Sequence, residues 1–557
     1  MQAIGCPPTA SKGKLRFESV SFADIPSQSN LFLRYQSDPL SLRKYYPSAV
    51  ASHTEIAHRA GEVLDNYSTD RDKLCDALFA QNTRFRAGAR VMENIDLLRR
   101  DGTVAILTGQ QAGLFTGPLY TVYKALSAIR MAECFRNRGI DAVAVFWAAT
   151  EDHDFEEISK AFFLGPAGNE IEFDLSRADK FAGLPVGKVP IPVSFDRVFA
   201  DQMAKLPDSE WKDDVAAMLG DWKSGRLIAD SFCSQLHVLF KNYGLIVVDP
   251  LDPGIKKLSA PIYADAVARS EEIVSALVER SKELEVEGYH AQVQVSPDYF
   301  PLFYHGDDAV RRAIRRRGDE YRVIDTNTRF TKNELIELAR DEPERLSPGV
   351  MLRPIVQDHL FPTVCYFGGA AEVAYFAQNS EVYRILGRPP TAILHRQSFT
   401  LVEPRHARAL EKYDLKFADM FRGFEDLRRE IVERYVNPSA ARLFADAEEG
   451  INLQLNSLDQ ELSRIDPTLA ANLATRRRKI AYHLAALRKK FHRVQLERDE
   501  IADRRLRSLF GSVLPDGHLQ ERKLNVGNFL LVYGPQLIDW IYDAVDLDER
   551  GHRLLYL

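Results

Sequence analysis

Two apolar runs separated by a helical pattern constrain this fold most strongly. Residues 104–107 (VAIL) and 142–147 (AVAVFW) have the length and composition of buried strands, and residues 119–136 between them are expected to form a helix. Pro118 suits the first turn of that helix, and Gly139 follows its expected end. Strand, helix and strand in this order predict a βαβ unit with parallel strands and a right-handed crossover.

Polar side chains follow both predicted strands. The first strand runs into Thr108, Gly109, Gln110 and Gln111, and the second runs into residues 150–154 (TEDHD). Ligands of parallel sheets bind outside the carboxyl ends of the strands, so we predict that both runs contribute to one binding site.

The loop after the first strand has two interpretations. The helix N-terminus near Gly117 and Pro118 offers N–H groups to a phosphate or carboxylate. Alternatively, the glycines serve only the geometry of a strand-to-helix turn. The loop matches neither the GxxxxGK[ST] nor the GxGxxG phosphate-binding pattern.

Residues 151–157 form a dense acidic run with one histidine. Metal ligation is one interpretation, and binding of a substrate ammonium or hydroxyls with His153 as acid or base is another. The third is the acidic first turn of a helix, which accounts best for Glu156 and Glu157. We predict Asp152, His153 and Asp154 as catalytic candidates and Glu151 as a substrate-binding residue; no metal ligand set is predicted, because no ligand spacing supports one.

Length and composition set broader limits. A chain of 557 residues is expected to form two to four units. With 73 basic and 79 acidic side chains it has no chain-wide nucleic-acid footprint, so nucleic acid is not an expected partner. Five scattered cysteines without a CxxC pair argue against a disulfide framework or a cysteine zinc site. Without a signal peptide or a run of about 18 apolar residues, we expect a cytoplasmic protein with no membrane association.

Patterns along the chain predict a core interrupted twice. The core comprises residues 1–158, 242–290 and 351–403, with insertions at 159–241 and 291–350; an antiparallel coiled-coil domain spans 404–512, and residues 513–557 pack back on the core. In the second insertion we predict strands at 292–296 and 321–324, followed by a capping box formed by Thr331 and Glu334.

The coiled-coil prediction depends on two heptad seams. The apolar positions are Ile451, Leu455, Leu458, Leu462, Ile465 and Leu469, then Ile480, Leu484, Leu487, Phe491 and Val494. Asp466 and Pro467 between the seams predict the turn of a helical hairpin. The basic runs 476–479 and 488–490 are interpreted as its solvated face, with an RNA or acidic-partner patch as the alternative.

Several long motifs resemble one known family. Residues 108–124 (TGQQAGLFTGPLYTVYK) and 146–158 (FWAATEDHDFEEI) closely resemble signatures of the bacillithiol biosynthesis cysteine-adding enzymes, the BshC family. So do residues 352–358 (LRPIVQD), 366–369 (YFGG) with Glu372, 396–403 (RQSFTLVE) and 533–535 (YGP). The resemblance extends over essentially the whole chain.

The resemblance implies an α/β fold with a Rossmann-like parallel-sheet core, similar to class I cysteinyl-tRNA synthetase. Two connective-peptide insertions interrupt that core, and an α-helical coiled-coil domain forms a homodimer. It also implies a ligase that joins L-cysteine to glucosaminyl-malate in the last step of bacillithiol biosynthesis. Neither the HIGH nor the KMSKS motif of the synthetases is present. Amide formation from a free carboxylate is uphill in water, so ATP or ADP is expected as a nucleotide co-substrate, and no other cofactor is expected.

The resemblance and the strand ends together suggest roles for individual residues. Gln110, Gln111 and Tyr120 would orient substrate, and Arg353 and Arg396 would hold anionic groups. One of Asp152, His153 and Asp154 would accept the amine proton or bind the ammonium. The further substrate-binding candidates are Lys124, Gln357, Asp358, Gly368, Gly369, Glu372 and Ser398. A metal-dependent hydrolase and a non-catalytic scaffold are the alternative functions.

Overall fold

The computed structural model describes residues 15–166, 168–176, 179–498 and 500–557. The chain forms two compact units. Among the described residues, the first comprises those from 15 to 165 together with those within 170–400 and 520–555, and the second comprises those within 166–169, 401–519 and 556–557.

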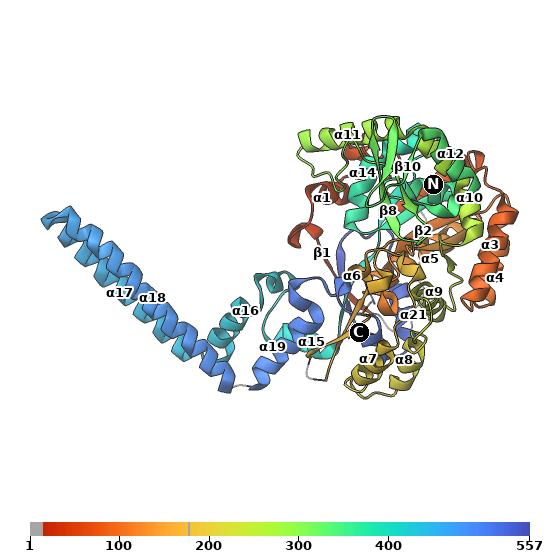
Figure 1. Ribbon diagram of the computed structural model, residues 1–557. Helices are drawn as coiled ribbons and strands as arrows, with labels where there is room; N and C mark the ends of the chain where they lie inside the picture. Colours follow the sequence, from red (N-terminus) through yellow and green to blue (C-terminus); the bar gives the residue numbers. More distant parts are fainter. Residues whose placement is uncertain (1–14, 167, 177–178, 499) are drawn as a thin grey trace. The chain divides into compact units, whose positions relative to one another are not determined.

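A five-stranded parallel sheet forms the centre of the first unit (Figure 1). Its strand order is β13 (Ala392–His395), β12 (Thr363–Gly368), β2 (Val104–Gln110), β3 (Ala142–Ala148) and β6 (Ile246–Val248). Every neighbouring pair is parallel, and α5 (Tyr120–Arg136) connects β2 to β3. The predicted βαβ unit and the α/β fold class are therefore confirmed.

Helices on either side of this sheet bury its apolar strands. All seven residues of β3 and the first six of β2 are buried, as expected for central strands of a parallel sheet. Besides α5, the described helices of this unit include α1 (Asn30–Ser37), α2 (Ala60–Asp65), α3 (Arg71–Arg84), α4 (Ala89–Leu98), α10 (Pro253–Ala268), α11 (Ser270–Val286), α13 (Arg353–Leu360) and α14 (Ala370–Ile385).

The segment that follows β3 begins with the short helix α6 (Phe155–Ile158) and the antiparallel hairpin β4 (Lys160–Leu164) and β5 (Glu170–Asp174). It continues through α7 (Ser194–Met203), α8 (Lys212–Leu219) and α9 (Ile228–Leu239) to β6. Its aromatic side chains surround Phe115, whose ring contacts those of Phe163, Phe173 and Trp222.

A second, antiparallel sheet follows α11. Its order is β10 (Arg329–Phe330), β9 (Glu320–Val323), β8 (Arg311–Arg317), β7 (Leu302–His305) and β11 (Leu346–Pro348). The predicted strand at 321–324 corresponds to β9, and the predicted capping box opens α12 (Lys332–Asp341). The prediction of a strand at 292–296 is wrong. The Val293 backbone bonds to the Gln378 side chain through both its N–H and its carbonyl, at 2.9 Å each, in place of a neighbouring strand.

The chain's last segment returns to the first unit. It contains α20 (Gly527–Tyr533), α21 (Gln536–Ala544) and β15 (His552–Tyr556), and β15 lies between β1 (Arg16–Val20) and β14 (Ser398–Val402). Asn525 donates hydrogen bonds of 2.8 Å to the carbonyls of Phe115 and Gly117, which holds the loop between β2 and α5.

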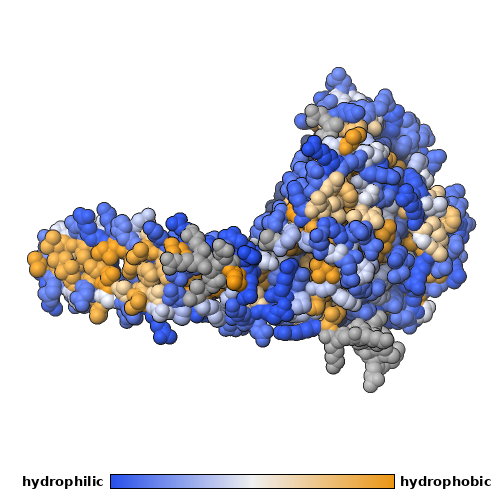
Figure 2. Space-filling model, turned by 90° about the horizontal axis from the view of Figure 1, so that it is seen from below, coloured by the Kyte–Doolittle hydropathy of each residue, from blue (hydrophilic) through white to orange (hydrophobic). Residues whose placement is uncertain are grey.

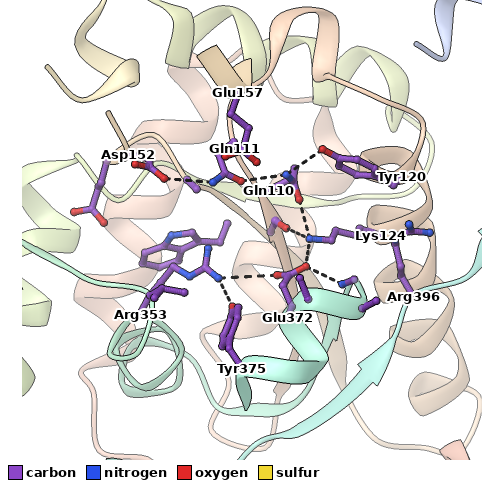
Figure 3. A pocket seen from close by; sticks show the side chains of 18 of the residues that line it. Gln110, Gln111, Tyr120, Lys124, Asp152, Glu157, Arg353, Glu372, Tyr375 and Arg396 are labelled. Atoms are coloured by element: carbon purple, nitrogen blue, oxygen red, sulfur yellow. Dashed lines mark hydrogen bonds and ion pairs between the residues drawn. The ribbon is translucent and has the colours of Figure 1, made fainter. Parts of the chain in front are cut away.

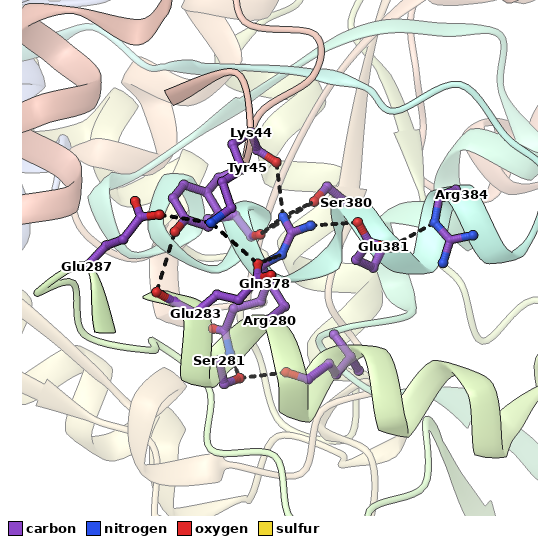
Figure 4. Close-up of polar contacts among 12 residues, drawn as sticks. Lys44, Tyr45, Arg280, Ser281, Glu283, Glu287, Gln378, Ser380, Glu381 and Arg384 are labelled. Carbon is purple, nitrogen blue, oxygen red and sulfur yellow. Dashed lines mark hydrogen bonds and ion pairs between the residues drawn. The ribbon is translucent and has the colours of Figure 1, made fainter. Parts of the chain in front are cut away.

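A polar cluster around Arg280 joins α11 to α14 and to the N-terminal region (Figure 4). The guanidinium donates to Ser380 Oγ at 3.0 Å and to the Lys44 carbonyl at 3.2 Å. It also pairs with Glu381 at 2.6 Å and with Glu283 at 3.1 Å. The Arg280 side chain is only 9% exposed, so its charge is balanced entirely within the protein.

The second unit is helical. It contains α15 (Pro404–Lys412), α16 (Phe424–Ile431), α17 (Pro438–Ile465), α18 (Pro467–Arg498) and α19 (Glu500–Val513). The helices α17 and α18 form the predicted antiparallel hairpin (Figure 1). Asp466 makes its turn by accepting the Thr468 N–H at 2.7 Å, and Arg477 bonds across the hairpin to Asn456 at 2.7 Å.

The hairpin leaves many of its apolar side chains in contact with solvent. Figure 2 shows a band of hydrophobic residues along one face of the α17–α18 arm. Leu458 is 47% exposed and Ile465 is 73% exposed, although both occupy the predicted seam. Two helices alone therefore do not bury this heptad surface.

In the described part of the chain, none of the helices combines the length and the apolar character required to cross a membrane. Cys75, Cys233 and Cys365 are free and buried, whereas Cys134 is disulfide-bonded.

Candidate active site

A cavity of about 310 Å³ opens at the carboxyl ends of the central strands (Figure 3). The ends of β2 and β3 line it, together with the first turn of α14 after β12. The strand β2 has β3 on one side and β12 on the other, so the chain changes direction across the sheet here. Such a switch point is the usual ligand site of an open parallel sheet. The predicted meeting of polar strand ends therefore occurs at a real cavity.

Gly109 lets two strand ends approach closely at this cavity. A Cβ at Gly109 would lie 2.6 Å from the Trp147 carbonyl oxygen, which is too close for any other residue. The Gly109 carbonyl in turn accepts a 2.8 Å hydrogen bond from Lys124 Nζ on α5. The glycine thus serves strand packing and leaves its carbonyl to hold Lys124.

Lys124 and Glu372 form a buried ion pair in the cavity wall. Lys124 also donates to Gln110 Oε1 at 2.8 Å, and Glu372 accepts hydrogen bonds of 2.8 Å from the Tyr366 hydroxyl and the Gly369 N–H. Burial alone would raise the pKa of Glu372, but the charges of Lys124 and Arg353 outweigh it and lower that pKa. Glu372 is therefore a carboxylate already committed to protein partners.

Arg353 extends this network from the start of α13. It hydrogen-bonds the Tyr375 hydroxyl and lies 4.0 Å from Glu372 Oε1. Its Nε is buried without a hydrogen-bond partner among the described residues. The Arg353 guanidinium is therefore held by Tyr375 in the cavity wall, and Glu372 partly neutralises its charge.

Two further ion pairs close the side of the cavity near the second insertion. Arg311 on β8 lies 3.4 Å from Asp152 Oδ1 and stacks 3.7 Å above the Phe303 ring. Burial would raise the pKa of Asp152, but Arg311 and the His153 backbone N–H lower it. Behind this pair, Glu151 is buried against Lys256.

Arg396 occupies the opposite wall. Its two terminal nitrogens donate to Glu521 at 2.8 Å each, and both side chains are at least 96% buried. This bidentate pair neutralises the guanidinium, which also lies 5.7 Å from the centre of the Tyr120 ring. The sequence suggested that Arg396 holds an anionic group of the substrate. In the structure, the carboxylate paired with Arg396 is that of Glu521.

Glu157 on α6 and Arg522 at the end of a short 3-10 helix (Gln520–Arg522) also line the cavity. Their charged groups make no hydrogen bond or ion pair with another described residue. Burial, followed by the charges of Asp152 and Asp154, raises the pKa of Glu157 above its ordinary value of 4.5.

Much of the predicted site is brought together. The cavity lining includes Gly109, Gln110, Gln111, Tyr120, Lys124, Glu151, Asp152, Arg353, Gly369, Glu372 and Arg396. Gln111 donates to Asp152 at 3.3 Å and Gln110 to the Tyr120 hydroxyl at 3.4 Å, so the two polar runs contact each other directly.

Two of the three predicted catalytic residues do not line the cavity. Asp154 caps α6 by accepting the Glu157 N–H at 3.3 Å. His153 Nδ1 lies 3.2 Å from the Arg311 guanidinium. Because arginine has no acceptor, that nitrogen must accept the bond and is not free to take a substrate proton.

Other predicted binding residues have structural partners away from the cavity. Thr108 donates to the Phe367 carbonyl at 2.8 Å, and Gly368 ends β12 behind Gly369. Asp358 accepts from Tyr383 at 2.6 Å and from Thr391, next to the buried Gln357. Ser398 bonds to Glu521 and His552 at 2.8 Å each.

The predicted anion site at the start of α5 is also outside the cavity. Gly117 has φ 73°, the left-handed conformation that glycine permits, and its carbonyl accepts from Asn525. The Leu119 N–H donates to the Leu524 carbonyl at 2.9 Å. Gly117 and Pro118 therefore form a turn whose backbone is engaged by the C-terminal segment.

Sequence reasoning missed several lining residues: Trp147, Arg311, Tyr375 and Arg522, and it attributed Glu157 to helix-end electrostatics. Nothing near Arg311 or Arg522 in the sequence connects them with the strand ends. A signal existed for Glu157, which falls inside the acidic motif, and for Trp147, which ends the predicted strand 142–147.

The acidic run does not converge on one point. Glu151 turns to Lys256, Asp152 to Arg311, and Asp154 to its own helix. Among the described residues there is also no group of three or more His, Cys, Asp or Glu side chains arranged to hold a metal ion.

The fold and the cavity define a class: a Rossmann-like α/β protein with a cavity at the switch point of its sheet and an added coiled-coil arm. The sequence profile described as "Bacillithiol biosynthesis BshC, N-terminal Rossmann-like domain" matches residues 15–397, and "Bacillithiol biosynthesis BshC, C-terminal coiled-coil domain" matches residues 399–557. The chain therefore belongs to the BshC family.

Relatives from three bacteria agree with this assignment, and each carries the name "Putative cysteine ligase BshC". The Koribacter versatilis protein is 34% identical, covering 95% of this chain and 97% of its own length. Those of Solibacter usitatus and Salinibacter ruber are each 33% identical, covering 96% and 94% of this chain and 98% and 96% of their own lengths.

Among solved structures, one titled as a putative arginyl-tRNA synthetase from Campylobacter jejuni matches at 12% identity with a TM-score of 0.21. The match covers 76% of this chain and 94% of that one, but it is too distant to indicate fold or activity.

Proposed function

We propose that this protein is a ligase that forms an amide between the carboxyl group of L-cysteine and the amine of glucosaminyl-malate, the last step of bacillithiol biosynthesis. The observation that carries the proposal is the cavity at the sheet's switch point, which combines hydrogen-bonding amides and hydroxyls with charges of both signs. Both substrates combine amine, carboxylate and hydroxyl or thiol groups. The names of the relatives agree with this chemistry.

Several lining residues suit an amino-sugar acceptor. The side-chain amides of Gln110 and Gln111 and the Tyr120 hydroxyl can each donate to and accept from sugar hydroxyls. Lys124, which is paired with Glu372, donates a hydrogen bond to Gln110 Oε1 and so orients the Gln110 amide. These side chains form hydrogen bonds with one another already, which lowers the entropic cost of ordering them on binding.

Activation of the cysteine carboxylate requires an energy source, and a nucleoside triphosphate is its simplest form. Such a compound carries several negative charges. Within the described lining, Arg522 is the single cation without an anionic or hydroxyl partner, so this cavity is a poor match for a triphosphate. We therefore assign the acceptor to the cavity and derive no nucleotide step from its residues.

The test is a reconstitution with the full-length chain, L-cysteine, glucosaminyl-malate and ATP, with thiol products measured by mass spectrometry. Formation of bacillithiol supports the proposal. Absence of product in this mixture, together with unchanged bacillithiol after deletion of the gene in its host, would overturn it. Accumulation of glucosaminyl-malate in the deletion strain is the expected cellular result, and omission of ATP tests the energy source.

We also propose that two copies of this chain form a homodimer through their α17–α18 arms. The support is the exposed seam, in which Leu458 and Ile465 contact solvent. Light scattering after gel filtration should give twice the chain mass of 63.2 kDa. Replacing both residues by glutamate should give monomers, whereas glutamate at Val286, which is 88% exposed on α11, should leave the dimer intact. A monomeric natural protein would contradict the proposal.

A further inference from the structure

Two charges in the cavity stand apart from the others. Most ionised side chains of the lining have a partner of opposite charge: Lys124 and Arg353 with Glu372, Glu151 with Lys256, Asp152 with Arg311, and Arg396 with Glu521. Within the described residues, the carboxylate of Glu157 and the guanidinium of Arg522 have none. These two groups are therefore the ones available to the charges of a ligand.

Both groups act on the same part of the cavity. Burial raises the pKa of Tyr120 to about 12; the negative charge of Glu157 adds to this increase, and the positive charge of Arg522 opposes it. The Tyr120 hydroxyl thus lies within the fields of both. Figure 3 shows the Glu157 side chain directed into the cavity beside Gln110 and Gln111.

We propose that Glu157 is the base that takes the proton from the acceptor's ammonium group, and that Arg522 binds a carboxylate of the same acceptor. This inference rests on the proposed ligase function and names the two charged groups by which the site recognises its acceptor. The acceptor is a molecule that carries an amine at one end and a carboxylate at the other, as glucosaminyl-malate does.

The proton moves from the acceptor's ammonium group to Glu157 before the amide forms. An ammonium N–H bond breaks, and the proton joins a carboxylate oxygen of Glu157. The nitrogen lone pair then forms the C–N bond to the activated cysteinyl carbonyl carbon. The bond from that carbon to the activating phosphate oxygen breaks, and its electron pair leaves with the phosphate. The nucleoside triphosphate that formed the activated cysteine supplies this leaving group. The nitrogen, now bonded to the carbonyl carbon, loses one further proton to solvent water, which leaves the neutral amide.

The surroundings of Glu157 favour it over Asp152 as the base. Arg311 pairs with Asp152 and lowers its pKa, which makes that carboxylate a weak base. The pKa of Glu157 is instead raised by burial and neighbouring negative charge, which strengthens its affinity for a proton. The titratable groups that face Glu157 are Asp152, Asp154, Tyr120, Lys124 and Glu372. Among them Lys124 opposes the increase, but its charge is already paired with Glu372.

Arg522 suits the carboxylate end for a related reason. An arginine fork binds a carboxylate through two parallel hydrogen bonds, and its charge is permanent. The other arginines of the cavity, Arg311, Arg353 and Arg396, already have protein partners. Arg522 is also exposed, so a substrate can reach it from solvent.

The experiment measures steady-state ligation from pH 5 to 9 with four variants. Glu157→Gln removes the base but keeps the shape, and we expect kcat to fall by about 10²- to 10⁴-fold. We also expect the rise of the rate with pH through the pKa of Glu157 to disappear. Glu156→Gln is the matched control, since Glu156 is exposed on the same helix and does not line the cavity; its profile should equal that of the natural protein.

Arg522→Gln should raise KM for glucosaminyl-malate by about 10- to 100-fold with a smaller change in kcat, because charge-assisted hydrogen bonds are lost. It should not change kcat/KM for glucosamine, which lacks the malate carboxylates. Arg522→Lys should recover part of the affinity. Calorimetry of glucosaminyl-malate binding, which needs no turnover, should give the highest affinity for the natural protein, a lower one for Arg522→Lys and the lowest for Arg522→Gln.

The outcomes separate the two proposals. If the natural protein ligates cysteine but Glu157→Gln keeps its rate and pH profile, the base assignment is wrong and the ligase function stands. Equal KM values of Arg522→Gln and the natural protein would likewise remove Arg522 from acceptor binding. If the natural protein neither binds nor ligates glucosaminyl-malate, both the proposed function and this inference fail.

Discussion

The cavity and the Arg280 cluster are two buried collections of charge in the same unit, and they differ in one respect. Arg280 uses its N–H groups on Glu283, Glu381, Ser380 and a backbone carbonyl, and Gln378 beside it bonds to Ser281 and Val293 (Figure 4). The cavity has equally complete pairs, but it also contains Glu157 and Arg522. Closed clusters hold helices together, whereas an unpaired charge at a cavity is available for a ligand.

The closed cluster should show the largest effect on stability. Arg280→Ala removes the buried partner of Glu381 and Glu283 and leaves them only the more exposed Arg384 and Lys44, so the free energy of unfolding should fall by about 3–5 kcal/mol. Urea unfolding followed by circular dichroism measures this. Activity per folded molecule should be unchanged, because no atom of Arg280 lines the cavity.

The control for this variant is Arg384→Ala. Arg384 pairs with Glu381 as well, at 2.8 Å, but its side chain is 64% exposed. Its loss should cost at most about 1 kcal/mol. Equal effects of the two substitutions would show that burial does not govern the cluster.

Within the cavity, the Lys124–Glu372 pair is expected to serve both stability and substrate binding. Lys124→Met should lower stability by about 3 kcal/mol and reduce turnover, because it leaves the buried Glu372 carboxylate with only Arg353, 4.0 Å away, and frees Gln110. The double variant Lys124→Met with Glu372→Gln should recover about 1–3 kcal/mol of that stability. It should not recover turnover.

A thermal unfolding series of the four proteins in this cycle separates the two readouts. Strict additivity of the two substitutions would contradict the direct ion pair. Recovery of activity in the double variant would show that the pair serves folding alone.

Glu157→Gln should change stability least, and it should raise the free energy of unfolding, whereas Arg280→Ala and Lys124→Met lower it. Its pKa is raised in the fold, so the folded state holds its proton more tightly than the unfolded state. The ionisation of Glu157 therefore lowers stability as pH rises from its unfolded value of about 4.5 through its folded value. At pH values above that range, the free energy of unfolding of Glu157→Gln should equal that of the natural protein or exceed it by at most about 0.5 kcal/mol, because the side chain is partly exposed. At pH 4 the two proteins should be equally stable.

A clear loss of stability in Glu157→Gln at pH 8 would place Glu157 with the closed pairs and remove the contrast between the two regions. Gain of stability on removing a charged residue is the behaviour expected of a functional group.

The fold was predictable wherever a local pattern sufficed. Apolar runs specified β2 and β3, heptads specified α17 and α18, and Thr331 with Glu334 specified a helix start. The pattern misled at residues 292–296, whose alternation resembles a strand but whose backbone pairs with Gln378, 85 residues later. No local signal reports such a partner.

The candidate site divides in the same way. Its strand ends, Gly109 to Gln111 and Glu151 to Asp152, follow from the sequence alone, because the carboxyl ends of parallel strands meet at one edge of a sheet. Which charges are free was decided by the tertiary structure. Arg396 is neutralised by Glu521 and Asp152 by Arg311, and both partners come from distant segments. Ion pairing depends on distances across the fold, which the order of residues does not contain.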